Sequence, residues 1–453
     1  MVPGIHNLQK LLRFGSGGSL RKRLVYGSIG SFGVKTAASA VSLIATIVLA
    51  RHLGVEHFGV YSYIFGLTTL VAIPIQLGLP DLVVRETAKS TAKGELGLLL
   101  SLWRWANTSV IAFSIAVGTL MSLVAHYMPH VSSSWNASVF YWAILLVPLM
   151  SLTKLRESSM RGLGHVVIGQ ISDSVVRPAL LIMFVLIAGW IWPNSMDAVR
   201  AMRIHVIASC LALGLSAFLL SRLWPRDLER GSRSSYRSRQ WIVSALPLAF
   251  IAGMGVINNQ ADIVMLGIFQ TPEQVGSYKV AIQGAMLVSF GLSAMAMATM
   301  PYFARFHELG EMRKFQMLAT YGARFMFSIS LPAAIVFIAF GRQIIGFVFG
   351  EEYVGAYFPL VILSSVHVIH AGFGIIGPLL VMTGHERTAA KGIALAALMN
   401  VVLNLWLIPK FGMIGAACAT ASSLVFWNVI LWVAVRHKLG IDSSAVGLPM
   451  KIL

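Results

Sequence analysis

Apolar residues fill this chain in long blocks, and short polar segments separate one block from the next. Each block can cross the roughly 30 Å of hydrocarbon in a bilayer, for which a helix needs about 20 apolar residues. Such blocks exceed the roughly 10-residue alternating strands of a membrane β-barrel. The pattern predicts an all-α integral membrane protein with about twelve transmembrane helices, at residues 28–50, 57–79, 104–126, 138–153, 173–192, 204–221, 241–268, 276–301, 318–340, 356–382, 392–407 and 413–435.

Composition and charge support this class and predict an orientation. Hydrophobic residues make up 57% of the 453 residues and charged residues only 11%, which excludes a soluble globular domain. With the N-terminus and alternate loops in the cytoplasm, 26 of the 35 Lys and Arg residues face that side, so both termini are predicted to be cytoplasmic. This topology accounts for the net charge of +18, and we expect membrane lipids, not nucleic acid, as its partner.

The spans are predicted to form two halves. Residues 1–224 hold six spans, a basic linker covers 225–240, and 241–453 hold six more. The halves echo one another, because Gly59-Val60-Tyr61 follows the first span and Gly276-Ser277-Tyr278 follows the seventh. The echo predicts parallel repeats with a substrate site between two lobes. The outward loops are too short to fold as a catalytic domain, so we expect a transporter and not an enzyme.

One face of the first span is polar. Ser39, Ser42 and Thr46 follow Lys35 at offsets of four, seven and eleven, which places the four side chains along one helical face. A charge at the bilayer centre costs about 2.5 to 3.5 kcal/mol, so it usually faces protein or water. The stripe predicts the lining of a wet cavity. The alternative is that Lys35 extends to the headgroups while the hydroxyls bond their own backbone.

A second polar group is predicted on spans seven and eight. Asn258 and Asp262 share one helical face, and Lys279 and Gln283 share another at the same spacing of four. Asp262 could pair with Lys279, either as a structural tie between adjacent helices or as part of a transport site. Asp262 could instead couple ion movement to transport.

Cations outnumber carboxylates within the spans. Arg177, four residues after Asp173, is predicted at the inner end of the fifth span, either as a solvated ion pair or as a site residue. The excess predicts a cavity that attracts an anionic group, and the cations concerned are Lys35, Arg177, Lys279 and Arg324.

No cofactor is expected from the sequence. His367 and His370 are one helical turn apart, but no carboxylate or Cys ligand lies near them, so packing is the favoured role and no metal is expected. Cys210 and Cys418 both fall within predicted spans, which argues against a disulfide.

Short sequence motifs in order along the chain resemble a known family. They are ARHLGVEHFGVYSYIFG from Ala50, GLPDLVVRE ending at Glu86, RGLGH from Arg161, VVRPALL from Val175, LPLAF from Leu246, ADIVMLGIF from Ala261, VGSYKVA from Val275, PYFARF from Pro301, FGEEY from Phe349 and NVVLNLWLIPKFGMIGAACAT from Asn400. Together they are similar to Wzx-type polysaccharide flippases, the polysaccharide transporter branch of the MATE and oligosaccharidyl-lipid exporter (MOP) superfamily. The resemblance covers most of the chain and does not specify the sugar.

The resemblance implies a V-shaped pair of six-helix lobes in the bacterial inner membrane. Such flippases move undecaprenyl-diphosphate-linked repeat units to the periplasmic leaflet by alternating access, for O-antigen or exopolysaccharide biosynthesis, alongside a polysaccharide polymerase and a chain-length regulator. Lys35 and Lys279 would then meet the diphosphate, with Arg85 and Arg177 nearer its inner entrance. Sugar groups would be bound by Ser39, Ser42, Asn258 and Gln283.

Two alternatives remain open at this point. A cation-coupled multidrug exporter of the same superfamily would share the fold, but it should present a carboxylate-rich cavity, whereas the first span carries Lys35. A membrane polysaccharide polymerase or ligase would be an enzyme and should display a sizeable outward catalytic loop, which the short loops argue against.

Overall fold

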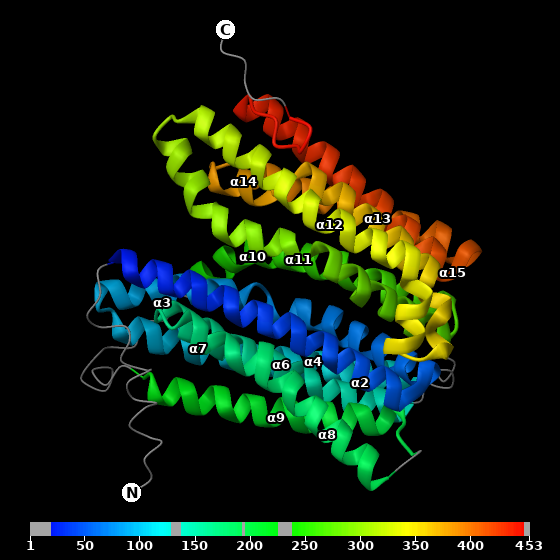
Figure 1. Cartoon of the computed structure of the whole chain (residues 1–453). Coiled ribbons are helices and arrows are strands. Elements are labelled where there is room, and N and C mark those ends of the chain that lie inside the picture. Colours follow the sequence, from blue (N-terminus) through cyan, green and yellow to red (C-terminus); the bar gives the residue numbers. More distant parts are fainter. Residues whose placement is uncertain (1–19, 128–136, 193–194, 225–237, 448–453) are drawn as a thin grey trace, which may run out of the picture.

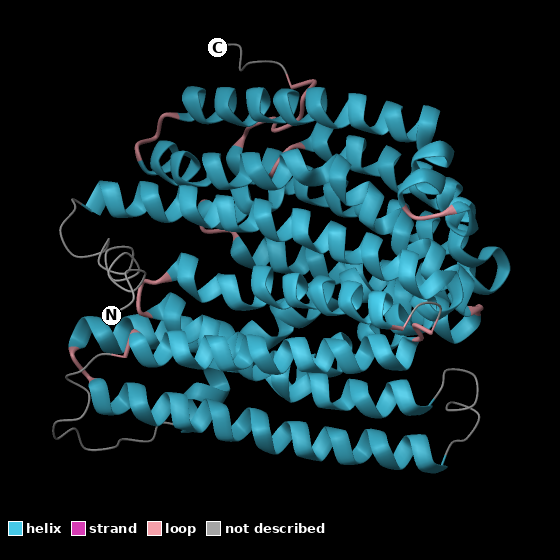
Figure 2. Ribbon diagram, turned by 60° about the horizontal axis from the view of Figure 1, so that its bottom comes forward, coloured by secondary structure: helices cyan, strands magenta, loops and turns pink. Residues whose placement is uncertain are grey.

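The computed structural model describes residues 20–127, 137–192, 195–224 and 238–447. Within these ranges every regular element is a helix (Figures 1 and 2), so the all-α prediction is confirmed. Residues 20–224 are called the first half below, and residues 238–447 the second half. The predicted linker falls mainly outside the described residues, and only its last three residues, 238–240, are seen, as the start of a helix.

The first half contains long helices and three shorter elements. They are α2 (Leu20–Gln76), α3 (Leu79–Lys93), α4 (Leu96–Tyr127), α6 (Ala137–Gly162), α7 (Val166–Ile171), the π-helix η1 (Ser172–Val176), α8 (Arg177–Ile191) and α9 (Ala198–Arg222).

The second half also consists of long helices and a few shorter elements. Its elements are α10 (Ser238–Phe269), α11 (Pro272–Glu308), α12 (Met312–Val348), the 3-10 helix η3 (Glu351–Ala356), α13 (Tyr357–Phe373), α14 (Ile376–Met382) and α15 (Glu386–Leu439).

Each predicted span coincides with a helix, but helix boundaries differ. Among the described residues, nine segments are long and apolar enough to cross a membrane. Two of them hold a pair of predicted spans each, because α2 continues through a kink at Gly54 and α15 through a kink at Gly412. Both glycines have a positive φ, 71° and 56°, which a residue with a Cβ rarely adopts. Span ten is instead interrupted between α13 and α14.

Helix α3 is an element that the apolar pattern does not predict. Leu79, Leu82 and Val83 are buried along one face, whereas Arg85 and Lys89 lie on the other. A 15-residue amphipathic helix of this kind is too short and too polar to read as a span.

Hydrophobic packing joins the two halves at both ends of the molecule, since Trp241 and Ala245 of α10 share a core with residues of α2, α3 and α4. In Figure 1 the helices of the first half lie below those of the second half. One buried core contains residues of both, from Leu49 to Tyr63 near the α2 kink and from Ile345 to Leu363 around η3. A second core is confined to residues 303–441. We call the end of the molecule at which α2 kinks at Gly54 the kink end. The opposite end, where α9 ends and α10 begins, is called the linker end.

Two glycines allow the halves to approach closely at the kink end. A Cβ added at Gly59 of α2 would overlap the carbonyl oxygen of Pro272, and one at Gly276 of α11 would overlap that of Val55. Only glycine fits a helix crossing this tight. These are the two glycines of the echo in the sequence.

Hydrogen bonds between the halves also lie at the kink end. The Arg51 guanidinium donates to the carbonyl oxygens of Phe347 and, at 2.7 Å, Val348, which end α12. The Tyr353 hydroxyl donates to the carbonyl oxygen of Ala50 at 2.9 Å. The structure is therefore closed at this end by contacts that any opening there must break.

Candidate functional site

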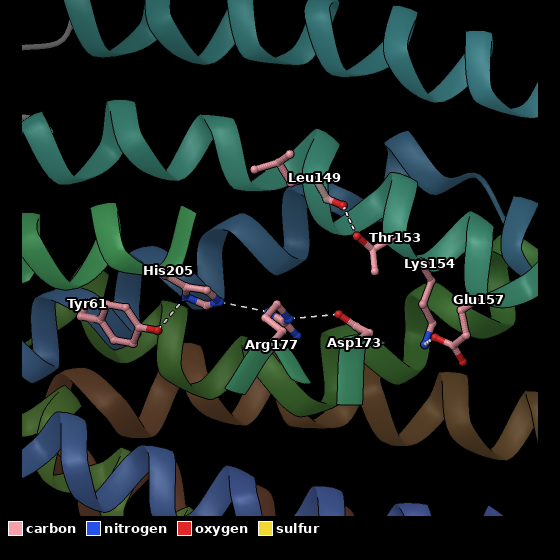
Figure 3. Close-up of polar contacts among 8 residues, drawn as sticks. All are labelled: Tyr61, Leu149, Thr153, Lys154, Glu157, Asp173, Arg177 and His205. Carbon is pink, nitrogen blue, oxygen red and sulfur yellow. Dashed lines mark hydrogen bonds and ion pairs between the residues drawn. The ribbon is translucent and has the colours of Figure 1, made fainter. Parts of the chain in front are cut away.

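A chain of four polar side chains crosses the interior of the first half. The Asp173 carboxylate pairs with Arg177 at 3.0 Å, the Arg177 guanidinium contacts His205 Nε2 at 3.0 Å, and His205 Nδ1 contacts the Tyr61 hydroxyl at 2.7 Å. Figure 3 shows the four residues in a row, contributed by η1, α8, α9 and α2. Arg177 and Asp173 retain 17% and 19% exposure, so this end of the chain is open to a ligand, whereas His205 is buried.

The π-helix creates this geometry. Pro178 lacks the backbone N–H that an α-helix would use at that position, and the helix widens over Ser172–Val176. The prediction that Arg177 lies at the inner end of its span is wrong, because helix begins at Val166, seven residues before Asp173. The ion pair is therefore inside the helical bundle.

The hydrogen-bond pattern fixes the protonation state of His205. A guanidinium can only donate, so Nε2 must accept from Arg177 and carries no proton. The proton of the neutral imidazole is then on Nδ1, which donates to the Tyr61 oxygen. The Phe65 ring stacks on the imidazole at 5.1 Å and closes its apolar side. His205 thus holds Arg177 by its uncharged acceptor nitrogen.

A group of cations surrounds one buried carboxylate on α6. Glu157 is 3% exposed and accepts from Lys154 at 2.8 Å, while Arg161 lies 3.6 Å from its other oxygen. Lys35 of α2 is exposed and lies within electrostatic reach of both cations. Lys154 and Arg161 therefore share the one carboxylate, and Lys35 adds a third positive charge beside them. We call these four residues the α6 cation group.

The residues of the polar stripe on α2 have two different environments. Ser39 and Ser42 are exposed beside Lys35, but Thr46 is buried and donates to the Ser42 carbonyl oxygen at 2.9 Å. The first three positions can thus meet a ligand, and Thr46 follows the backbone-bonded alternative.

The second half contains an acidic polar centre. Asp262 is 4% exposed and accepts hydrogen bonds from Asn404 at 2.6 Å, from Tyr278 at 3.1 Å and from Thr420. Asn400 lies 3.0 Å from the Asn404 amide nitrogen. The centre joins α10, α11 and both parts of α15, and no cation among the described residues pairs with its carboxylate.

The predicted pairing of Asp262 with Lys279 does not form. Lys279 is half-buried, and its ammonium makes no hydrogen bond or ion pair with any other described residue. Gln283, one turn later, is buried, and Asn258 is half-buried on α10. Tyr278, adjacent to Lys279, takes the position on Asp262 instead.

Arg85 is separate from the other predicted cations. It lines a pocket with Glu86 and Lys89 of α3 and Arg239 of α10, at the linker end. No contact among the described residues joins it to Lys35 or Arg177.

His370 of α13 takes a packing role. His370 Nδ1 contacts Asn428 Oδ1 at 2.7 Å, and the imidazole lies 5.5 Å from the Trp427 ring.

Sequence reasoning missed several residues of these centres. Lys154, Glu157 and Arg161 lie beyond the predicted end of the fourth span at residue 153, although α6 continues to Gly162. Their spacing of three and four would have placed them on one helical face. His205 was detectable as a titratable residue within a predicted span, but its partners come from distant segments.

Comparison with known proteins identifies the family. The model described as "Polysaccharide biosynthesis protein" matches residues 24–307, which is more than half of the chain. The chain belongs to the polysaccharide biosynthesis protein family. It is 23% identical to the "Probable low-salt glycan biosynthesis flippase Agl15" of Haloferax volcanii, over 90% of this chain and 82% of the relative. The "Probable flippase AglR" of the same organism is also 23% identical, with the same coverage.

Solved structures show the same fold. An inward-facing multidrug resistance MATE family transporter of the MOP superfamily matches with a TM-score of 0.71 and 13% identity, over 91% of this chain and 98% of that one. The lipid II flippase MurJ in an inward closed conformation also matches with a TM-score of 0.71, at 12% identity over 91% and 87%. The predictions of a multi-pass membrane protein and of a MATE-like all-α fold are confirmed, and the MurJ structure shares this fold. The expectation of a transporter and not an enzyme agrees with the relatives named as probable flippases.

Proposed function

We propose that the protein moves a polyprenyl-diphosphate-linked oligosaccharide between the leaflets of the membrane. The observation that carries this proposal is the α6 cation group, in which Lys154 and Arg161 share the single carboxylate of Glu157 and Lys35 adds a third positive charge beside them. A diphosphate would supply the missing negative charge, while its lipid chain stays in the hydrocarbon. Family membership and two relatives named as probable flippases support this substrate class.

The finer assignment rests on the resemblance of the sequence. In it the carrier is undecaprenyl diphosphate, the product serves O-antigen or exopolysaccharide biosynthesis, and the protein lies in the bacterial inner membrane with both termini cytoplasmic. Residues 1–224 and 241–453 act as two lobes, joined by the linker at 225–240, that move the unit to the periplasmic leaflet. A polysaccharide polymerase and a chain-length regulator would act on the product.

Each polar group has a distinct role in this proposal. Lys35 and Lys279 contact the diphosphate, since Lys279 has no protein partner among the described residues. Arg177 offers the N–H groups that His205 and Asp173 leave free. Sugar hydroxyls meet the neutral side chains Ser39, Ser42, Asn258 and Gln283. Arg85 belongs to the separate pocket at the linker end, to which we assign another ligand.

Asp262 is proposed to couple ion movement to transport. A buried carboxylate without a cationic partner is costly unless it is protonated or binds a cation. The buried Asn404 Oδ1 has no hydrogen-bond partner among the described residues and lies in the same centre. This free acceptor, beside a carboxylate that has no ion-pair partner among the described residues, suits a proton or a small monovalent cation.

Reconstitution tests the transport proposal. Liposomes would contain the protein and a fluorescent polyprenyl-diphosphate oligosaccharide, and arrival of the label in the opposite leaflet would be measured. We expect Lys35→Ala to lose transport and Lys314→Ala to keep it, because Lys314 is an exposed lysine whose one ion pair among the described residues is with Glu311. No movement by folded wild-type protein, under proton and sodium gradients, would reject the flippase and favour a cation-coupled drug exporter.

The coupling proposal has its own test. In the same liposomes, Asp262→Asn should bind the labelled lipid as wild type does but lose the acceleration that a proton or sodium gradient produces. The gradient that matters identifies the ion. Full gradient-dependent turnover by Asp262→Asn would exclude this carboxylate as the coupling group.

A further inference from the structure

A basic pocket of about 590 Å³ lies between α3 and the first turns of α10. Arg85 and Lys89 both pair with Glu86, at 3.0 and 3.2 Å, whereas Arg239 has no ion pair or hydrogen bond with any other described residue. Three cations thus face one carboxylate. The lining also offers the amide of Gln240 and the hydroxyl of Ser244. The pocket is suited to an anionic group that carries hydroxyls.

Tryptophan side chains cluster beside this pocket, which we place at the depth of the lipid headgroups. Trp241 lines the pocket and lies 5.2 Å from Trp105 of α4. Nearby, Trp103 lies 5.3 Å from Trp224, which follows α9. Tryptophan is enriched where the hydrocarbon meets the headgroups, because its ring is apolar and its N–H is polar. The amphipathic α3, with its basic outer face, is also typical of an interfacial helix.

An exposed apolar face leads from the pocket along α10. Val243 lines the pocket and is 63% exposed, and Leu246 and Phe250 follow at 56% and 53%. Their spacing of three and four residues places them on one face of the helix. The pocket and this face together match a molecule with an anionic head and an apolar tail, rather than free phosphate.

We propose that this pocket binds the headgroup of a resident anionic phospholipid, which is not transported. Its phosphate would contact Arg85, Lys89 and Arg239, its headgroup hydroxyls Gln240 or Ser244, and its acyl chains the exposed face of α10. Anionic phospholipids are abundant at a membrane surface that carries basic protein segments. Because α3 belongs to the first half and α10 to the second, the lipid would link the two halves at the linker end.

The test measures lipid binding directly. Protein purified in detergent would be titrated with phosphatidylglycerol or phosphatidylcholine, with bound lipid counted by native mass spectrometry. We expect selective binding of phosphatidylglycerol, and a roughly 30-fold weaker affinity in the Arg85→Gln/Arg239→Gln variant, which corresponds to about 1 kcal/mol for each cation near an anionic surface. Melting without added lipid checks that the variant is folded.

The matched control is Lys93→Gln/Arg104→Gln. Lys93 ends α3 and Arg104 lies on α4, so the same charge is removed nearby without touching the pocket lining. An equal loss of affinity in this control would overturn the proposal in favour of general electrostatic attraction. A second overturning result is unchanged phosphatidylglycerol binding in the pocket variant together with a raised transport KM, because the pocket would then be an entrance for the transported carrier.

Discussion

The imidazole of His205 is predicted to matter for transport through one of its two nitrogens. Nε2 accepts from Arg177, and Nδ1 donates to Tyr61. The amide of a glutamine ends at the distance from the backbone that Nε2 has, and the amide of an asparagine ends at that of Nδ1. His205→Gln can therefore accept from Arg177, His205→Asn can keep only the Tyr61 contact, and His205→Leu can do neither.

The hydrogen bond from Arg177 sets the expected magnitude. A hydrogen bond to a charged group contributes roughly 1.5 to 3 kcal/mol, or roughly 10- to 100-fold in an equilibrium constant. Without it, the guanidinium keeps only Asp173 of η1 as a partner among the described residues, 3.0 Å away. We expect the apparent KM for the lipid-linked oligosaccharide to rise at least about tenfold in His205→Leu and His205→Asn, and to stay within about threefold of wild type in His205→Gln.

The assay is the initial rate of label transfer in liposomes, measured over a range of substrate densities. A positioning role for His205 predicts an altered KM with a maximal rate close to that of wild type, after correction for the fraction of folded protein. A purely structural role would instead lower the amount of folded protein in all three variants and leave the KM of the remainder unchanged.

Two results would refute this reasoning. Rescue by asparagine and not by glutamine would show that the Tyr61 contact is the one required. A wild-type KM in His205→Leu would show that Arg177 either does not meet the substrate or needs no help from His205. Arg177→Lys is a useful companion, because lysine keeps the charge but loses the planar fork of donors.

Three further predictions concern helix packing and the chain ends. Gly59→Ala should lower the melting temperature, since its methyl group would overlap backbone across the α2–α11 crossing, whereas Gly214→Ala, with open space around it, should not. Arg51→Gln should speed opening at the kink end, measured as faster labelling of a cysteine introduced there. Burial alone would raise the pKa of Asp442, but hydrogen bonds from Trp432 and Ser444 lower this pKa below the usual aspartate range. The stabilisation from the Asp442 carboxylate should therefore be lost as pH falls through the lowered pKa. Asp442→Asn should have a lower melting temperature at neutral pH, and its melting temperature should depend less on pH in the acid range.

The apolar pattern predicted the helices well because the bilayer demands continuous apolar runs. It predicted their ends poorly, since a helix can continue past the hydrocarbon while its residues become charged. The end of α6 was therefore missed, and with it Glu157, which is buried although it lies beyond the apolar run. The breaks predicted between spans one and two and between spans eleven and twelve are confirmed, because the backbone at Gly54 and Gly412 is non-helical and separates two helices in each case.

The partners of the charged residues were harder to predict than the residues themselves. Asp262 was recognised from its place within a span, but it meets Asn404 and Thr420, 142 and 158 residues away in the chain. Spacing along one helix cannot identify such partners. The expected partner Lys279 was the wrong neighbour by one position, and a single residue rotates a helical side chain by about 100°.

That rotation explains why the echo in the sequence pairs a glycine with a tyrosine two residues later. Two residues turn a helix by about 200°, so the glycine and the tyrosine point to opposite faces. Gly59 and Gly276 accordingly face each other across the halves, while Tyr61 and Tyr278 each point into their own half.

The two tyrosines are linked to groups of opposite charge. Tyr61 contacts His205, which holds the cationic Arg177, whereas Tyr278 contacts the carboxylate of Asp262. The repeated glycine and tyrosine therefore connect the close contact between the halves to a cationic centre in the first half and an anionic centre in the second half. In the transport that we propose, an anionic substrate and a coupling cation are favoured by opposite charges. Arg177 and Asp262 would then act on them from different halves, on either side of the α2–α11 crossing that both tyrosines flank.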